Sequence, residues 1–268
     1  MLEQFVRDRE SYSYVPAHLV QADADGTLTT WSGRKLNAFV PVDWQKGGSA
    51  VRSKYSSMKL DRMHRELLMS ESDEDLEQGV MSVYFWGHAS GTDDRVNDRR
   101  AHERAKWLPI GKSGGTPQPQ SEVVDYLRRA RQHMREGRVD QALLSAMNLK
   151  HFKMSFASKL LAFLSPDSAG VYDKVIGDYL PKDPDATLKT LGLDTQTARP
   201  EVQTATYARW CDWCRNKATE LNVASLSWKD WDGQSYEWRA LDVERAIFAR
   251  ASRSRRSSHS LSLGSAAI

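Results

Sequence analysis

Short segments with helical periodicity, joined by short connections, fill the second half of this 268-residue chain. Residues 121–137 show the pattern well, because apolar side chains recur every three to four positions from Val123 to Met134. Ser121 stands at the start as a candidate cap, and Gly137 follows as a stop. Further helices are expected over residues 139–148, 155–164, 173–180, 204–222 and 239–251. Such a succession predicts a mainly α fold, a helical bundle with a minor β element.

The first 75 residues are more mixed, and we expect them to form an α/β region of their own. Glycine punctuation and β-branched and aromatic residues over 27–44 predict short strands, whereas 56–70 has the apolar spacing of a helix. Residues 76–250 would then form the helical domain. The last stretch, 251–268, combines arginines and serines without apolar periodicity, which predicts a disordered basic tail.

The composition is ordinary for a soluble globular protein. Hydrophobic residues make up 40% and charged residues 27%, and the net charge of +3 points only weakly to an anionic partner. No apolar run approaches the roughly 20 residues needed to span a bilayer, and the N-terminus lacks the apolar core of a signal peptide. We therefore expect a monomeric, cytoplasmic protein that does not associate with membranes.

The two cysteines, Cys211 and Cys214, stand in a C-x-x-C inside an expected helix. This pair supplies half of a structural zinc site and would need two further ligands from elsewhere. We favour two small, half-buried helix residues and expect neither a metal nor another cofactor. The alternative is an interaction domain stabilised by zinc.

A polar stretch over residues 87–120 predicts a long loop with one short helix around 99–107. Its basic residues either contact phosphates or form a solvated face, since acidic residues are interleaved with them. They are Arg95, Arg99, Arg100, Arg104, Lys106 and Lys112.

One aspartate, Asp173, lies where the pattern alone offers a simple explanation. It directly precedes the short helix that opens with Lys174, so it could be an N-cap worth about 1 kcal/mol. The order of the elements that precede it suggests a further role. A helix at 139–148, a tight turn, the helix "SFASKLLAFL" and a loop all precede "VYDKVIG" in that order.

In this order, and in the closing "DVERAIF", the chain resembles the helix-hairpin-helix DNA glycosylase superfamily over residues 80–250. It is most similar to the bacterial branch that resembles 8-oxoguanine DNA glycosylase. The resemblance implies a helical helix-hairpin-helix fold. It places Phe152 at the buried hairpin position and Ala157 at a close-packed position of the second helix. It places Asp173 at the catalytic aspartate and Ser155 where bifunctional members carry their Schiff-base lysine.

The hairpin departs from the family pattern, because His151 and Lys153 replace its glycines. Glycine serves there because the turn needs a positive φ and a close approach to phosphate. Either the hairpin has a different shape, or the side chains of His151 and Lys153 reach the phosphates.

The implied site contains three groups of residues. The catalytic residues would be Asp173 and Ser155. The DNA-binding residues would be His151, Phe152, Lys153 and Lys159. The aromatic pocket for an extruded base would contain Tyr84, Phe85, Trp86, Tyr207 and Trp210.

The chemistry suits a carboxylate, because cleavage of a base–sugar bond builds positive charge on the deoxyribose. The carboxylate could also orient an attacking water, as in glycosidases. Serine at 155 implies a monofunctional enzyme, with Lys153 or Lys159 as an amine nucleophile as the alternative.

We therefore predict a monofunctional DNA glycosylase acting on double-stranded DNA and leaving an abasic site. Its target would be a damaged purine in base excision repair, or a hypermodified phage base such as glucosylated hydroxymethylcytosine, removed in antiviral defence. The alternative is a non-catalytic DNA-binding helix-hairpin-helix protein in which Asp173 only caps a helix.

Overall fold

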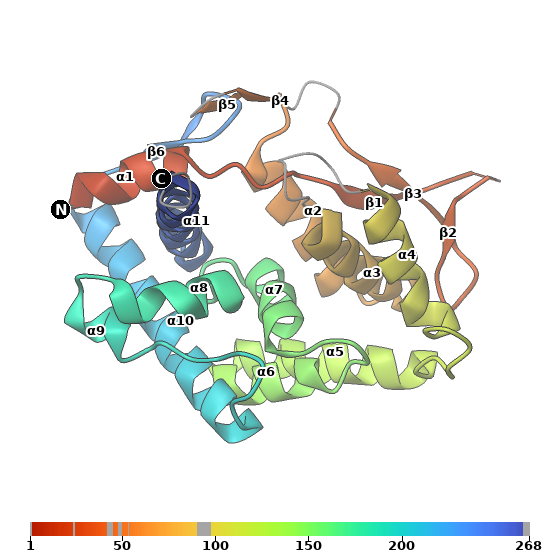
Figure 1. The fold of residues 1–268 in the computed structure, drawn as a ribbon. Coiled ribbons are helices and arrows are strands. Elements are labelled where there is room, and N and C mark those ends of the chain that lie inside the picture. The colour runs from red at the N-terminus through yellow and green to blue at the C-terminus, as the bar shows by residue number, and fades with distance from the viewer. Residues whose placement is uncertain are drawn as a thin grey trace.

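The chain forms a mainly α structure, as predicted, with short strands near its N-terminal end (Figure 1). The computed structural model describes residues 2–23, 25–41, 45–47, 50–52, 54–89 and 98–264. The helices before the hairpin are α1 (Leu2–Glu10), α2 (Ser57–Met69), α3 (Asp73–Ala89), α4 (Asp98–Ile110), α5 (Gln120–Arg135) and α6 (Val139–Met147). Those after it are α7 (Met154–Leu164), α8 (Lys174–Tyr179), α9 (Ala186–Lys189), α10 (Pro200–Val223) and α11 (Ala240–Gly264), with a 3-10 turn at Leu180–Lys182.

The strands are short and antiparallel. β1 (His18–Gln21), β3 (Lys35–Phe39) and β2 (Leu28–Thr29) form one sheet in that order. Two further pairs are β4 (Gln45–Gly47) with β5 (Ala50–Arg52), and β6 (Trp228–Lys229) with β7 (Ser235–Tyr236). The larger sheet is fixed to α3, where the Leu19 amide donates to Ser82 Oγ at 3.0 Å and Gln78 Nε2 donates to the Leu19 carbonyl at 3.2 Å.

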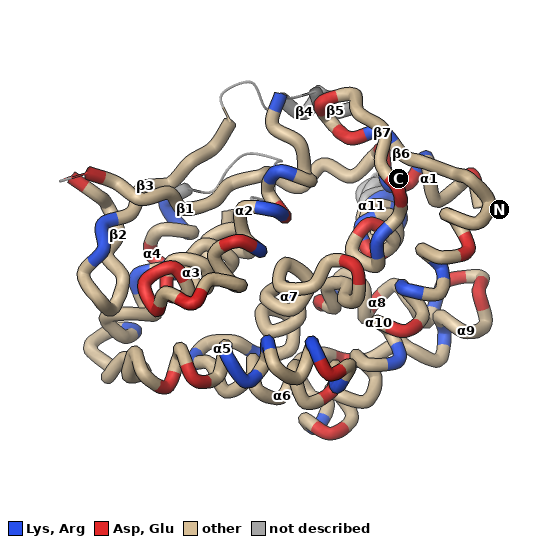
Figure 2. The backbone as a smooth tube through the Cα atoms, turned by 180° about the vertical axis from the view of Figure 1, so that it is seen from behind, with Lys and Arg blue, Asp and Glu red and all other residues tan. Residues whose placement is uncertain are grey.

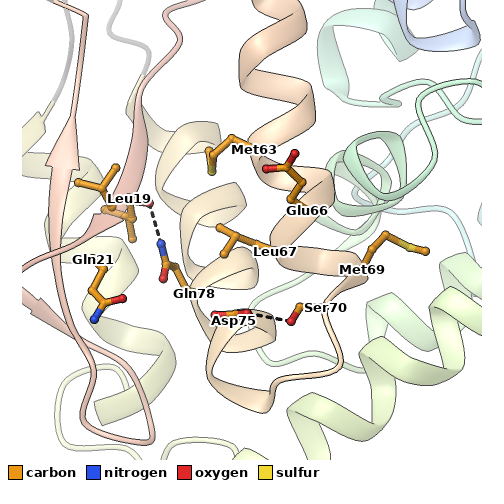
Figure 3. Close-up of a pocket in the computed structure, with 10 residues that line it drawn as sticks. Leu19, Gln21, Met63, Glu66, Leu67, Met69, Ser70, Asp75 and Gln78 are labelled. Atoms are coloured by element: carbon orange, nitrogen blue, oxygen red, sulfur yellow. Dashed lines mark hydrogen bonds between the residues drawn. The ribbon is translucent and has the colours of Figure 1, made fainter.

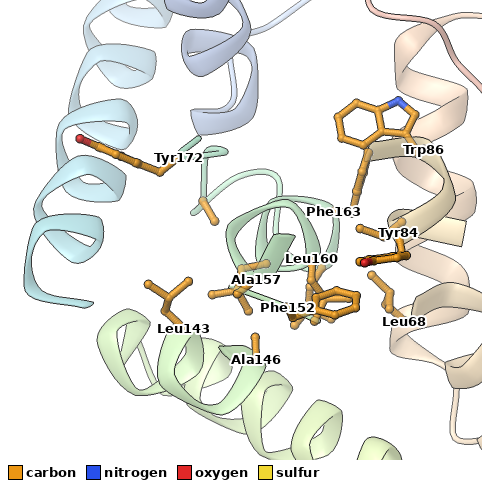
Figure 4. Close-up of a cluster of buried hydrophobic side chains, with 14 of the residues drawn as sticks. Leu68, Tyr84, Trp86, Leu143, Ala146, Phe152, Ala157, Leu160, Phe163 and Tyr172 are labelled. Atoms are coloured by element: carbon orange, nitrogen blue, oxygen red, sulfur yellow. The ribbon is translucent and has the colours of Figure 1, made fainter. Parts of the chain in front are cut away.

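Helix α7 lies at the centre of the molecule, between α2 and α3 on one side and α8 and α10 on the other (Figure 1). Nine of its residues, from Met154 to Leu164, are buried, which suits a helix that is apolar on nearly every side. Figure 4 shows Phe152 and Phe163 reaching toward Tyr84 and Trp86 of α3. The core is therefore built around the helix that follows the predicted hairpin.

The ends of α5 differ slightly from the prediction. Pro119, and not Ser121, is the N-cap, and its side chain makes no capping hydrogen bond. The other end is as expected, since Gly137 follows the helix with a φ of 74°. None of the described helices is both long and apolar enough to cross a membrane.

Helix α11 extends through residues for which we expected a disordered tail, because long-range ion pairs hold its middle. Ala251 is fully buried, and Arg250 Nε donates to Asp8 Oδ2 of α1 at 2.8 Å. Arg253 binds the same carboxylate and Ser11. The helix continues to Gly264, and the last four residues lie outside the described part.

A buried ion network joins α1, α2 and α11. Asp242 accepts from Arg9 Nε at 3.2 Å and from Arg239 Nε at 2.7 Å, while Asp61 accepts from Arg239 Nη2 at 2.6 Å and Arg245 Nη1 at 2.9 Å. Burial alone would raise the pKa of Asp242, but Arg239 and Arg9 together outweigh burial and lower it to about 2. The network therefore keeps both aspartates ionised and ties the two ends of the chain together.

We predict that Asp61→Asn lowers the free energy of unfolding by about 3–5 kcal/mol, because it leaves buried guanidinium groups without their counter-charge. Urea denaturation would measure this. Asp178→Asn is the control, since Asp178 pairs with Lys174 on the surface and its loss should cost less than about 1 kcal/mol. Equal losses in the two variants would show that the network does not stabilise the fold.

Candidate active site

The connection between α6 and α7 forms a tight hairpin although it contains no glycine. His151 adopts a φ of 71°, the left-handed region that glycine would favour, and the Phe152 amide donates to the Leu149 carbonyl at 2.9 Å. Histidine is enriched several-fold at such positions relative to most residues. The turn thus keeps a positive φ where the family pattern has glycine.

Contacts from distant segments support this turn. Gln118 accepts from the Lys150 amide at 2.8 Å and donates to the Asn148 carbonyl at 3.2 Å. The His151 ring lies 5.9 Å from the Trp107 ring, and its Nε2 is buried without a hydrogen-bond partner in the described part of the chain. Burial, then Lys150, lowers the pKa of His151. The ring therefore packs inward.

The two other predicted hairpin residues have different environments. Phe152 is buried, with its ring centroid 5.2 Å from that of Tyr84. Lys153 is exposed as the residue before α7. Of the predicted hairpin side chains, Lys153 is thus the one most available to a phosphate.

Asp173 uses its two carboxylate oxygens differently. Oδ1 accepts from the amides of Val175 at 2.9 Å and Ile176 at 3.2 Å, so the side chain caps α8 as the simple interpretation expects. Oδ2 forms an ion pair with Lys159 Nζ at 3.4 Å. The segment is fastened to α7 by Ser158, whose Oγ accepts from the Tyr172 amide at 2.9 Å. The second carboxylate oxygen, Oδ2, is therefore held in a fixed direction.

Asp173 and Lys159 line a small cavity together with Glu244 and Arg245 of α11. Five aromatic side chains also line it: Tyr12, Tyr14, Trp86, Phe163 and Phe248. The open volume is about 10 Å³, room for at most one water and far below the roughly 300 Å³ at which small-molecule sites begin. The cavity is closed in this conformation.

The two carboxyl groups in the cavity have unlike surroundings. Glu244 is 3% exposed, and burial, followed by the nearby Asp173 charge, raises its pKa to about 8. Asp173 instead has two amide donors and an ammonium partner. A pair of carboxyl groups whose environments differ in this way is typical of acid–base sites.

Only part of the predicted site comes together at this cavity. Trp86 lines it, whereas Tyr84, Phe85, Tyr207 and Trp210 do not. Tyr84 stacks on the hairpin, and Phe85 is fully buried with its ring 5.2 Å from that of His102. Both α10 rings are fully buried, and Trp210 Nε1 donates to the Val171 carbonyl at 3.0 Å. These four aromatic residues are packing residues of the core.

The remaining predicted residues lie close to Asp173 in different ways. Ser155 does not line the cavity; its carbonyl lies 3.5 Å from Lys159 Nζ, one turn further along α7. Lys159 is nearly buried, with 8% of its side chain exposed, and its Nζ pairs with Asp173. It is therefore not on the outer surface where a phosphate would lie. Arg95, one of the candidate phosphate contacts, lies outside the described residues.

Sequence reasoning missed Glu244, Phe248 and the two tyrosines of the N-terminal segment. A signal for Glu244 existed, because it stands three residues after Leu241 and four before Phe248, on the apolar side of its helix. A charged residue at such a position is a candidate for a function. Tyr12 and Tyr14 lie in a loop with no periodicity, so nothing local pointed to them.

A larger groove lies between β1, α2 and α3, and the residues that line it include Leu19, Met63 and Leu67 (Figure 3). Its volume is about 500 Å³. The carboxylate of Asp75 in its wall is already engaged by Ser70 Oγ at 2.8 Å and Arg34 Nη1 at 2.7 Å. No amine–carboxylate pair like that of Lys159 and Asp173 faces this groove among the residues that line it.

Cys211 and Cys214 are both fully buried on α10. Burial raises the pKa of the Cys211 thiol to about 12, which disfavours the thiolate that a metal would require. In the described ranges, three or more metal-ligating side chains do not come together at any point.

Comparison with protein families identifies the chain. A family model described as "Putative 8-oxoguanine DNA glycosylase OGG-like protein" matches residues 17–248. The chain belongs to this OGG-like family. Searches of curated proteins and of solved structures return no match. The family confirms the resemblance inferred from the hairpin and Asp173, and it points to DNA glycosylase activity with DNA as the substrate.

We predict that Asp173→Ala destabilises the protein by about 1 kcal/mol more than Asp173→Asn does, because asparagine keeps the capping acceptor. The free energy of unfolding in urea would measure the difference. The same two substitutions at Asp185, which caps α9 by accepting from the Thr187 amide at 2.8 Å, provide the control. If alanine and asparagine cost the same at Asp173, capping does not explain how this carboxylate is held.

Proposed function

We propose that this OGG-like protein is a monofunctional DNA glycosylase that hydrolyses the N-glycosidic bond of a modified base and leaves an abasic site. One observation carries the proposal. Asp173, held by its capping of α8, lines an aromatic cavity in a member of a glycosylase family. The cavity supplies the stacking surfaces that a base taken out of the helix requires.

Asp173 acts on the sugar. As the bond between C1′ and the base breaks, positive charge develops on the deoxyribose, and the fixed Oδ2 stabilises it without reorganisation. Water then attacks C1′, and the same carboxylate orients it. Because two amides hold Oδ1, the carboxylate does not have to be reoriented during the reaction.

The surroundings of Asp173 in the described part of the chain support hydrolysis without strand cleavage. Ser155 occupies the position at which the resemblance implies a Schiff-base lysine in bifunctional enzymes. The amine nearest Asp173, Lys159, is ion-paired with it, and an ammonium ion has no lone pair with which to attack C1′. Lys159 serves instead to hold Asp173 Oδ2 toward the cavity.

The hairpin binds the DNA backbone through a small number of contacts. Lys153 is exposed there, and the first amide groups of α7 have no acceptor within the helix. His151 and Phe152 keep the turn in shape. Figure 2 shows Lys and Arg positions interspersed with Asp and Glu positions along the described backbone, so we expect DNA binding to depend on local contacts.

The base enters by displacing aromatic side chains. Tyr14 and Phe248 are half-buried, and their rings lie 6.2 Å apart at the cavity. Because the closed cavity admits no base, one of these rings moves aside and the base takes its place against Trp86. Side-chain rotamer changes at an interface are common when a complex forms.

We predict that wild-type protein forms abasic sites on one member of a DNA panel and that Asp173→Asn lowers the single-turnover rate at least about a hundredfold. The panel contains 8-oxoguanine, alkylated purines, uracil, and phage DNA with hydroxymethylated or glucosylated cytosine, so a positive result also distinguishes a repair substrate from an antiviral one. Breaks should appear only after alkali treatment.

Asp185→Asn is the matched control, since it changes a capping aspartate of α9 that does not line the cavity. Equal rates for the wild type and Asp173→Asn would remove Asp173 from the mechanism. Intact DNA binding with no abasic sites on any substrate would favour the non-catalytic DNA-binding protein. Breaks without alkali would contradict a monofunctional enzyme.

We predict that Lys153→Ala weakens DNA binding and reduces the slope of log K against log salt by about 0.9, the loss of one phosphate contact. Fluorescence anisotropy at several salt concentrations would measure both. Lys189→Ala, at an exposed position of α9, is the control and should leave the slope unchanged. An unchanged slope for Lys153→Ala would place the phosphate contacts elsewhere.

A further inference from the structure

Glu244 is a buried carboxyl group that shares the cavity with Asp173. It is 3% exposed, and no hydrogen bond or ion pair to its carboxyl group is found among the described residues. The nearby cations have other carboxylate partners, although Arg245 Nε makes no hydrogen bond within the described residues. Lys159 pairs with Asp173, and Arg245 Nη1 donates to Asp61 at 2.9 Å. A buried polar group left in this state requires an explanation.

Charged and neutral polar groups from several elements surround Glu244. Lys159 of α7 and Arg245 of α11 itself favour its ionised form, as does Arg9 of α1, whereas Asp173 before α8 opposes it. Neutral groups complete the surroundings: Tyr12 and Tyr14 from the N-terminal loop, and Tyr207 and Cys214 from α10.

The loop between α7 and α8 closes the remaining side. A Cβ added to Gly170 would lie 2.8 Å from the Cβ of Glu244, so the loop backbone packs directly against this residue. Burial is the largest influence, and together with Asp173 it raises the pKa of Glu244 to about 8. At neutral pH the side chain is therefore a carboxylic acid with a proton to donate.

We propose that Glu244 donates this proton to an acceptor atom of the base bound in the cavity and so acts as a second catalytic residue beside Asp173. The inference rests on the proposed function. The substrate class is a base that leaves in neutral form after gaining a proton on a ring nitrogen or a carbonyl oxygen. An ionised Glu244 would instead repel the negative charge that develops on the departing base.

The step balances. The electron pair of the bond between C1′ and the base nitrogen passes to the base as the bond breaks, and the Glu244 proton moves to the base. A water oxygen then bonds to C1′. The proton that this water releases, taken up first by Asp173 or by solvent, restores the acid form of Glu244. One water is consumed, and nothing is oxidised or reduced.

The pH dependence of excision tests the role. For the wild type, we expect the single-turnover rate to fall about tenfold per pH unit above about pH 8, as the acid form is lost. Glu244→Gln keeps a hydrogen-bond donor but cannot transfer its proton, so its rate should be lower and should lack this decline. Glu237→Gln, at an exposed position before α11, is the control. The same decline in Glu244→Gln would overturn the inference.

Two measurements need no substrate. The ¹³C carboxyl signal that Glu244→Gln removes should titrate far above the ordinary glutamate value of about 4.3. The melting temperature of Glu244→Gln relative to wild type should rise as the pH increases from about 5 to about 8, because in this range the unfolded wild type has released a proton that the folded protein keeps.

These results separate the proposed glycosylase function from the proposed role of Glu244. If no DNA in the panel acquires abasic sites, the proposed function is rejected, and the titration still shows whether the pKa of Glu244 is raised. An ordinary pKa for its carboxyl group would reject the acid role alone, whether or not the protein excises a base.

Discussion

The buried ion network between Arg9, Asp61, Arg239, Asp242 and Arg245 fixes α11, and the cavity depends on that helix. Three arginines share two aspartates, so each guanidinium group is directed toward a carboxylate of the network. The register of α11 then points the residue beside Arg245 into the cavity. Each of these guanidinium groups has a carboxylate of the network as its partner, whereas Arg245 Nε makes no hydrogen bond within the described residues. The same contacts that join the two ends of the chain therefore also place Glu244 at the cavity.

In the proposed mechanism, the structural role of Asp173 as a helix cap supports its chemical role. As a cap it would need only one oxygen, and both amides indeed bind Oδ1. The other oxygen is free to face Lys159 and the cavity, in a direction set by the capped helix. Electrostatic catalysis is strongest when the charge is already in place before the reaction. In the proposed mechanism the capping interaction thus prepares the carboxylate, so a role as a helix cap is compatible with the proposed catalytic role.

Structural features that depend on neighbouring residues could be predicted from the sequence, whereas features that depend on contacts between distant segments could not. The continuous apolar character of Met154–Leu164 predicts a central helix, and an aspartate before "KVIG" predicts a cap. The shape of the hairpin could not be predicted in this way. The positive φ of His151 is supported by contacts of the turn with Trp107 and Gln118, which lie far away in the sequence.

The aromatic residues of the pocket were harder to predict for the same reason, because helical spacing does not tell which face of a helix borders a cavity. The cavity itself shows why its aromatic walls matter before any base arrives. In the closed state Tyr14, Trp86 and Phe248 shield Glu244 from water. This desolvation is the main cause of its raised pKa and so favours its neutral form. A base that displaces one ring fills the same space and keeps water out in turn. The acid would therefore remain protonated throughout entry, and its proton would become transferable only when an acceptor atom of the base reaches it.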